Sequence, residues 1–370
     1  MKSTTLPYLI RKLFNLDYLQ KGRYKWVDYV RGIAILLVVY RHVLIGIERT
    51  GLVIPSGLVT ANMIFFSFRM PLFFILSGFF INSSLLKRTL PKLFFDKFEA
   101  ILYPYFIWCF LQVTLQIVFS SFTNASRGLV DYTYIFYHPR QLDQFWYLPA
   151  LFNVTIIYTL VKVKMKLNNV LQLLLGVVLY FLSRSFNQVS MMSDWMEFYI
   201  FFAAGDAFSG IFFKEKFQQW LSKFYVLLVS TPVFILIQVY YLHKGEEYFL
   251  SDLAGRGEFI FVSLLGCLFM FILAFNIQKA GFLSFLRIVG AHSLYIYVMH
   301  VFVAAFVRIL LMKFFLISNP VALLFAGIVI SIIVCIAFYN LLIKDGPLWF
   351  LFSISKKQSS YLNEKKSITS

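Results

Sequence analysis

Long apolar runs separated by short polar stretches dominate this chain. Most are near the ~20 residues that span a bilayer as a helix, and the two short runs, 147–163 and 168–186, lack the strict alternation of a barrel strand. The pattern predicts an all-α polytopic membrane helix bundle of about ten transmembrane helices. The runs fall near residues 30–48, 60–86, 98–121, 147–163, 168–186, 196–213, 222–243, 258–278, 290–312 and 320–343.

Composition agrees with a membrane protein. Of 370 residues, 60% are hydrophobic and 14% are charged, and the mean hydropathy is +0.77. Soluble domains usually contain a smaller share of hydrophobic residues and a larger share of charged residues. Cys109, Cys267 and Cys335 fall inside predicted spans without metal-ligand spacing, so we interpret them as buried apolar thiols and predict no metal site.

The net charge of +17 raises the question of a nucleic-acid partner. With the N-terminus inside, most basic residues fall in the inner segments and only a few in the outer loops, which is the positive-inside pattern. The distribution of the basic residues is therefore explained by membrane topology, and no nucleic-acid partner is predicted. Both termini are expected to be cytoplasmic. The first ~30 residues are polar and basic and do not resemble a cleavable signal peptide, so the first span would act as an uncleaved anchor.

The predicted organisation is a cytoplasmic N-terminal segment (1–24), a transmembrane domain (25–345) and a cytoplasmic tail (346–370). The longest outer loop, about 122–146, carries acids, arginines, a histidine and several aromatic residues. This mixture suits a lid or a platform for a polar ligand. It equally suits an ordinary interfacial loop with Tyr and Trp at the headgroup level, and the sequence leaves both open.

Two ionisable residues lie within the first span. Arg31 and His42 are eleven positions apart, and in an α-helix this spacing is within about 20° of a whole number of turns. The two side chains therefore share one helix face and lie about 16 Å apart along the axis. Ionisable groups at membrane depth usually mark function, and histidine exchanges protons near neutral pH. Asp28 could hold the Arg31 guanidinium in a bidentate pair. Alternatively, Arg31 is a snorkelling anchor and His42 makes an interhelical hydrogen bond.

The second span contains a further cation and a possible break. In FSFRMPLFFILSGFF, Arg69 precedes Pro71, and Ser77 and Gly78 follow. Proline frees backbone carbonyls, which protein or water must satisfy, and the small Ser-Gly pair permits close approach of another helix or a ligand. A packing kink is the plainer interpretation.

Aromatic and polar residues also mark later spans. FWYLPALF presents Trp146 and Tyr147, which an aromatic belt would explain. In HSLYIYVMH, His292 lies near the inner surface and His300 eight residues deeper, about 80° apart around the helix, so they form no obvious common site. Asp206 is an acid within the sixth predicted span whose partner the sequence does not reveal.

These motifs, in this order, resemble the acyltransferase-3 family of bacterial integral membrane O-acyltransferases, closest to its fucose-4-O-acetylase-like branch. The carrying features are Arg31 and His42 with Asp28 ahead of them, FRMPLFFILSGFF, FWYLPALF, and SLYIYVMH ending in His300. The resemblance covers roughly residues 24–345.

The resemblance implies a ten-helix enzyme of the bacterial inner membrane that passes an acyl group from cytoplasmic acyl-CoA to a glycan or lipid-linked sugar hydroxyl. Acetyl-CoA is the expected donor, and polysaccharide-assembly proteins and membrane lipid are candidate partners. Two departures stand out. Arg41 precedes His42 where many relatives have a small residue, and KRTLPKLFFDKFEAILYP lacks an arginine pair that some relatives show. The resemblance therefore does not assign CoA-phosphate contacts in that stretch.

Under this hypothesis His42 is the general base on the sugar hydroxyl, and Arg31 holds the CoA phosphates. The ~16 Å between them matches the scale of an extended pantetheine arm. Arg69 is a candidate contact for donor, acceptor or oxyanion, and the candidate substrate-binding residues are Trp146, Tyr147 and His300.

Two competing hypotheses remain at this stage. A transporter or flippase would show inverted repeats or paired broken helices, whereas we find one early proline interruption without a counterpart. A scaffold within a polysaccharide-assembly complex would need no chemistry at all.

Overall fold

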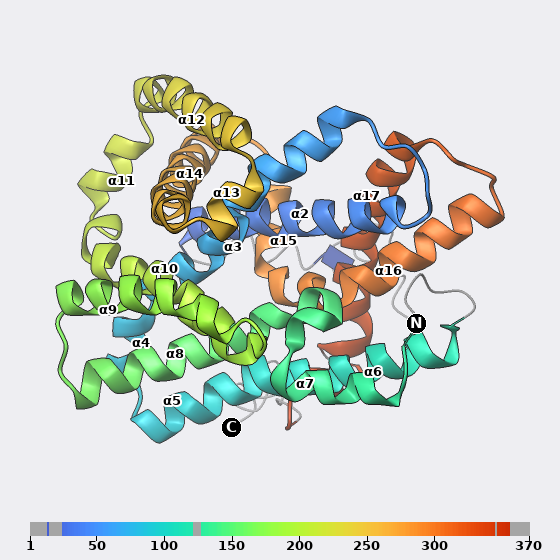
Figure 1. Cartoon of the computed structure of the whole chain (residues 1–370), viewed down its shortest axis with the longest axis horizontal. Helices are drawn as coiled ribbons and strands as arrows, with labels where there is room; N and C mark the ends of the chain where they lie inside the picture. The colour runs from blue at the N-terminus through green and yellow to red at the C-terminus, as the bar shows by residue number, and fades with distance from the viewer. Residues whose placement is uncertain (1–12, 15–23, 121–126, 345, 356–370) are drawn as a thin grey trace, which may run out of the picture.

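The computed structural model describes residues 13–14, 24–120, 127–344 and 346–355, and every regular element in these ranges is helical (Figure 1). Nine helices of the described chain are long and apolar enough to cross a membrane, or ten if one bent pair counts as a single span. The predicted all-α multi-pass bundle is thus confirmed. The observed helices often begin before the apolar runs, because helix continues into the polar membrane interface, as at Lys25 and Leu90.

The long helices are α2 (Lys25–Glu48), α3 (Ser56–Phe79), α5 (Leu90–Lys97) continuing through a π-helical turn (Phe98–Leu102) into α6 (Tyr103–Val118), α8 (Tyr147–Lys164), α9 (Asn169–Leu182), α10 (Ser190–Phe212), α12 (Phe224–Lys244), α14 (Leu253–Ala280), α16 (Ser293–Lys313) and α17 (Pro320–Phe338). The short helices are α4 (Ile81–Lys87), α7 (Tyr134–Tyr137), α11 (Glu215–Leu221), α13 (Glu246–Ser251) and α15 (Phe285–Ala291). Short segments of other helix types cover Leu129–Thr133, Pro139–Trp146, Ser183–Phe186, Tyr339–Ile343 and Trp349–Leu351, and the second of these is interrupted at Leu142 and Asp143. The bent pair is α10 and α11, which meet at 102°.

The loops predicted to be outer meet at one end of the bundle, which we call the outer end. Arg49 pairs with Asp143 at 3.2 Å, and the Ser190 N–H donates to His138 Nδ1 at 3.1 Å. Arg184 donates to the backbone of the segment that precedes α14. Segments that are far apart in sequence therefore close one end together.

The loops predicted to be inner meet at the opposite end, the inner end. The Tyr29 hydroxyl donates to the Phe282 backbone oxygen at 3.2 Å, and Tyr103 donates to Phe350 at 2.6 Å. This division of the loops is the one the hydrophobic runs predict. Which end faces the cytoplasm stays a prediction from the charge pattern.

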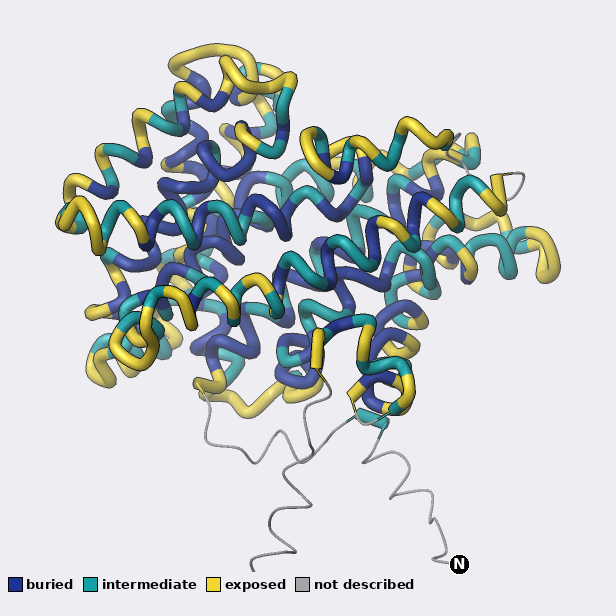
Figure 2. The backbone as a smooth tube through the Cα atoms, turned by 90° about the horizontal axis from the view of Figure 1, so that it is seen from below, coloured by how far each residue is buried: buried dark blue, intermediate teal, exposed yellow. Residues whose placement is uncertain are grey.

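Helix α2 lies in the middle of the bundle, where it packs against α3, α14, α15, α16 and α17 (Figure 1). Buried segments gather in the interior and exposed ones follow the outer helices (Figure 2). On the peripheral helix α12, Leu228 and Leu236 are 62% and 68% exposed, as expected for side chains that face lipid rather than water. The first predicted span thus becomes the central one.

Helices α3 and α10 approach closely at a pair of glycines. A Cβ on Gly78 would lie 2.1 Å from the Phe202 backbone oxygen, and one on Gly205 would lie 2.2 Å from the Ile75 backbone oxygen. This is the close helix approach that the Ser77-Gly78 pair predicts. Pro71, in contrast, lies inside a helix that continues without a break.

Gly78→Ala is expected to lower stability because the new methyl group must push the α3 and α10 backbones apart. Overpacking of this kind typically costs ~1–3 kcal/mol. Thermal unfolding in detergent measures it. The matched control is Gly57→Ala, since Gly57 lies in the same helix and a Cβ added there would have no neighbour within 4 Å. Equal melting temperatures for the two variants would contradict the packing argument.

Asp206 is the acid whose partner the sequence did not reveal. Its carboxylate accepts hydrogen bonds from the Tyr158 hydroxyl at 2.6 Å, from the Asn82 amide at 2.5 Å and from the Lys162 ammonium. The group joins α4, α8 and α10. Since a buried charge must be paired and hydrogen-bonded, we interpret this cluster as structural.

Candidate functional site

Two histidines from distant helices meet inside the bundle. The rings of His42 on α2 and His300 on α16 lie edge to face with their centroids 5.2 Å apart. His292 instead hydrogen-bonds with Asn340 and with the Ile288 backbone oxygen. The prediction that His292 and His300 form no common site agrees with this geometry. The contact between His300 and His42 was not predicted from the sequence.

The hydrogen bonds of His300 fix its tautomer. Its Nδ1 lies 2.9 Å and 2.8 Å from the backbone oxygens of Ile296 and Tyr297. Carbonyl oxygens only accept, so Nδ1 carries the proton and Nε2 carries the lone pair. Nε2 is buried and has no hydrogen-bond partner among the described residues. Because such a group is costly to leave unused, His300 presents a free proton acceptor beside His42.

His42 keeps part of its surface accessible although it lies deep in the bundle. In the described part of the chain its ring nitrogens make no hydrogen bond, so the interhelical hydrogen bond considered as an alternative is not found there. The imidazole is held by ring contact instead. Both of its nitrogens are thereby left open to a ligand.

Arg69 reaches from α3 toward the same place. It is 3% exposed, and its guanidinium donates to Asn62 Oδ1 at 3.3 Å and, weakly, to the Leu37 backbone oxygen on α2 at 3.5 Å. It lies within electrostatic range of His42. The structure therefore brings this predicted residue to the histidine pair.

Tyr147 continues the site toward the inner end. Its ring packs 5.3 Å from that of Tyr297, and its hydroxyl lies within hydrogen-bonding reach of Ser77. It also lies within electrostatic range of Arg31. Tyr297, which was not predicted from the sequence, thus connects Tyr147 to His300.

Trp146 lies beside Tyr147 and is partly exposed. The Arg140 guanidinium stacks on its ring at 4.5 Å. Arg140 is itself fixed by Asp194 at 2.5 Å and Glu197 at 3.1 Å. The indole is therefore held in a defined orientation between Tyr147 and Arg140.

Arg31 has a second cation near it. Lys97 on α5 lies within electrostatic range of Arg31, and both side chains are partly exposed. Lys97 was not among the residues predicted from the sequence, although it belongs to the stretch where the family resemblance suggests a pair of cations. Asp28 is buried where α2 meets α15, with its backbone oxygen 1.9 Å from a Cβ built on Gly290. Its role toward Arg31 stays a prediction.

Part of the long outer loop lies outside the described residues. The described part, from residue 127, packs on the outer end, where Asp143 pairs with both Arg49 and Arg127 at 3.2 Å and 3.6 Å. Burial, and then the charge of Arg140, lower the pKa of His138 below its ordinary value. The neutral ring fits its observed role as a hydrogen-bond acceptor. The loop carries Trp146 into the site, and a lid function stays a prediction.

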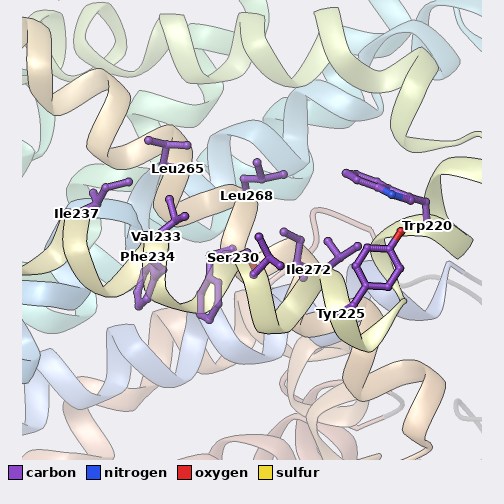
Figure 3. A pocket seen from close by; sticks show the side chains of 12 residues that line it. Trp220, Tyr225, Ser230, Val233, Phe234, Ile237, Leu265, Leu268 and Ile272 are labelled. Atoms are coloured by element: carbon purple, nitrogen blue, oxygen red, sulfur yellow. The ribbon is translucent and has the colours of Figure 1, made fainter.

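No group of three or more potential metal ligands occurs in the part of the chain that the structure describes. An apolar groove between α12 and α14 has a cavity volume of about 290 Å³ (Figure 3). Its polar side chains are Trp220 and Tyr225 at one end and Ser230, whose hydroxyl donates to the Leu227 backbone oxygen. The lining of the groove is mostly apolar and includes neither His42 nor His300, so we do not assign acyl transfer to it.

The fold and site define a multi-pass membrane protein in which polar side chains from several helices gather around two histidines inside the bundle. A sequence model of the acyltransferase-3 family, described as "Acyltransferase domain", matches residues 24–340, and the chain belongs to this family. The family membership is the one that the sequence resemblance predicted, and the described helices make the chain a multi-pass membrane protein of that family. This membership favours acyl-transfer chemistry over the transporter and scaffold hypotheses.

One relative is nodulation protein NolL of Sinorhizobium fredii (strain NBRC 101917 / NGR234). The chain is 30% identical to it over 109 residues, which cover 29% of this chain and 29% of that protein. The match therefore spans less than a third of the relative's length. No solved structure matches the chain.

Proposed function

We propose that this acyltransferase moves an acetyl group from cytoplasmic acetyl-CoA to a hydroxyl of a cell-surface or lipid-linked glycan, in the bacterial inner membrane. The observation that carries the proposal is the contact between His42 and His300, whose centroids are 5.2 Å apart. The pair lies inside the bundle, with Arg31 toward the inner end and Trp146 toward the outer end. A donor and an acceptor could thus reach it from opposite sides.

The donor is expected to bind with its phosphates at Arg31 and Lys97. The planar guanidinium of Arg31 and the compact ammonium of Lys97 together suit a multiply charged phosphate group. Arg31 lies eleven residues before His42 on α2, or about 16 Å along the helix. An extended pantetheine arm would carry the thioester over that distance, past Tyr147.

His42 would act as the general base. As the acceptor oxygen attacks the thioester carbonyl, its proton passes to His42, the carbon–sulfur bond breaks, and the proton then passes to the CoA thiolate. Arg69 is the cation best placed to stabilise the negative charge that develops on the carbonyl oxygen. His300 Nε2 would accept a hydrogen bond from the His42 ring and stabilise its protonated form. No covalent acyl-enzyme is needed in this scheme.

The acceptor is expected to enter from the outer end beside Trp146. A partly exposed indole whose orientation is fixed offers an apolar face with a polar edge, which suits a sugar ring. Arg140 covers part of that face in the absence of substrate. Trp146 would thus orient the acceptor rather than take part in the chemistry.

Two measurements test the proposal. Purified protein in proteoliposomes should release free CoA from acetyl-CoA only when a glycan extract of the same cells is supplied. Glycans from cells with the protein should contain species heavier by one acetyl unit than glycans from cells without it. Identical glycan masses together with no release of CoA would reject the assignment.

Arg31→Ala and Lys97→Ala are each expected to raise the KM for acetyl-CoA about ten- to a hundredfold with a smaller change in kcat. Charged hydrogen bonds contribute about 1.5–3 kcal/mol, and these cations would contact the donor far from the reacting atoms. Initial rates at varied donor concentration measure the effect. Lys164→Ala is the matched control, because Lys164 is an exposed cation of the inner end. An unchanged KM in both variants would remove the phosphate role.

A further inference from the structure

The apolar groove follows the inner half of α12, between this helix and α14 (Figure 3). On α12 its lining extends from Tyr225 to Ile237, which corresponds to about 18 Å of helix. Helix α12 begins at Phe224 at the inner end, and one leaflet of a ~30 Å hydrocarbon core is about 15 Å deep. The groove therefore spans the depth of one leaflet, from the inner interface to the middle of the membrane.

Helix α12 is anchored to the bundle at both ends of the groove. Beyond the outer end of the groove, Gln238 is 3% exposed, and the Ser67 hydroxyl of α3 lies 3.3 Å from its Oε1. At the inner end, the Asn276 amide of α14 donates to the Leu221 backbone oxygen at 3.0 Å, at the end of α11 that leads into α12. Between these anchors Val233 lines the groove and is still 48% exposed. The groove is thus a fixed feature of the fold that has room for a ligand.

Aromatic residues mark the inner mouth of the groove. Trp220 of α11 and Tyr225 of α12 lie together at this end (Figure 3), and they are 44% and 54% exposed. Helix α11 meets α10 at 102°, so it runs across the direction of that helix rather than along it. Tryptophan and tyrosine are enriched at the depth of lipid headgroups. We therefore place the mouth of the groove at the headgroups of the leaflet on the inner side.

Two lysines lie at the same mouth. The Lys223 ammonium is 5.8 Å from the centre of the Tyr225 ring. Lys279 follows the groove residue Ile272 by two turns and is within about 20° of the same face of α14. Both lysines are exposed, and neither forms an ion pair with an acid in the ranges that the structure describes. The mouth therefore has positive charge that no described carboxylate neutralises.

The N-terminus of α12 adds to this charge. Lys223 is its N-cap residue, and no side-chain hydrogen bond from the described residues caps the helix. A helix N-terminus presents free N–H groups and a partial positive charge, which favour an anion and disfavour a second cation. Glu215, the acid nearest to Lys223 in sequence, is at the opposite end of α11. An anion at the mouth would thus be stabilised by the lysines and by the end of the helix.

We propose that the groove holds one acyl chain of an anionic phospholipid from the leaflet on the inner side, with its phosphate at Lys223, Lys279 and the start of α12. The apolar lining gives the chain van der Waals contacts along one leaflet. The lysines select a negatively charged headgroup. This inference goes beyond the proposed function and does not depend on it, because neither His42 nor His300 lines the groove.

The test is native mass spectrometry of the delipidated full chain in an uncharged detergent. The probes are phosphatidylglycerol and phosphatidylcholine with the same acyl chains, so that only the headgroup differs. The chain should retain phosphatidylglycerol more than tenfold better. Lys223→Gln and Lys279→Gln should each weaken its retention about fivefold, the effect of one lysine near an anionic lipid. The matched control is Lys164→Gln, since Lys164 is an exposed lysine at the inner end of α8.

A second pair of variants tests the groove itself. Val233→Trp should fill the groove and remove the bound phosphatidylglycerol, and the protein should still fold because Val233 is half exposed. Leu236→Trp is the matched control, since Leu236 lies on the same helix, is 68% exposed and does not line the groove. Loss of the lipid in both variants, or in neither, would place it elsewhere and overturn the proposal.

Two further outcomes would reject the anionic lipid. Equal retention of both lipids, unchanged by the lysine substitutions, would show that the groove does not select a charged headgroup. A dimer that retains no lipid and dissociates on Val233→Trp would assign the groove to a second copy of the chain. If the proposal is right, phosphatidylglycerol should raise the melting temperature of the unmodified protein but not of Val233→Trp, because a ligand of the folded state stabilises it.

Discussion

His42→Ala is expected to lower the kcat of acetyl transfer by about 10²–10⁴, the range that a general base usually supplies. The substitution removes a partly accessible imidazole whose ring nitrogens make no hydrogen bond with the described residues. The KM for acetyl-CoA should change little, because the proposed phosphate contacts lie about 16 Å away. Steady-state kinetics in proteoliposomes measure both constants.

His243→Ala is the matched control for this variant. His243 is exposed at the outer end of α12, far along the chain from the site, and its loss should leave kcat unchanged. Both variants should insert and melt like the unmodified protein. If His42→Ala retained full kcat while folding normally, the general-base assignment would be wrong.

His300→Ala should lower kcat by about 10²–10³, the usual cost of removing one preorganised hydrogen-bonding partner from an active site. The reason is the fixed tautomer, which leaves the Nε2 lone pair of a buried ring without a partner among the described residues, on a ring in contact with His42. Without it, the protonated His42 ring loses its acceptor. The same steady-state assay gives the magnitude.

The double variant of His42 and His300 shows whether the two rings contribute to kcat as one unit or independently. If the two rings act as a unit, His42→Ala combined with His300→Ala should cost about as much as His42→Ala alone, since residues that act together are strongly non-additive. Fully multiplied losses would show that His300 supports the fold or the substrate independently. Melting temperatures of all three variants should be recorded to exclude a loss of folded protein.

The sequence determined features that depend on local spacing. Apolar runs near the length of a bilayer predict membrane helices, because backbone groups in lipid must be satisfied within the helix. The common face of Arg31 and His42 follows from helix periodicity alone. The ordered motifs predicted the family, and the family's sequence model confirms it over residues 24–340.

Only the tertiary structure decided which helices meet. His300 reaches His42 because α16 packs on α2, and Lys97 comes near Arg31 although 66 residues separate them in the chain. Asp206 finds Lys162 and Tyr158 for the same reason. Such contacts depend on which small residues let two helices approach, as Gly78 and Gly205 do for α3 and α10. Periodicity places a side chain on a face of its own helix, but the partner of that face is set by the packing of the whole bundle.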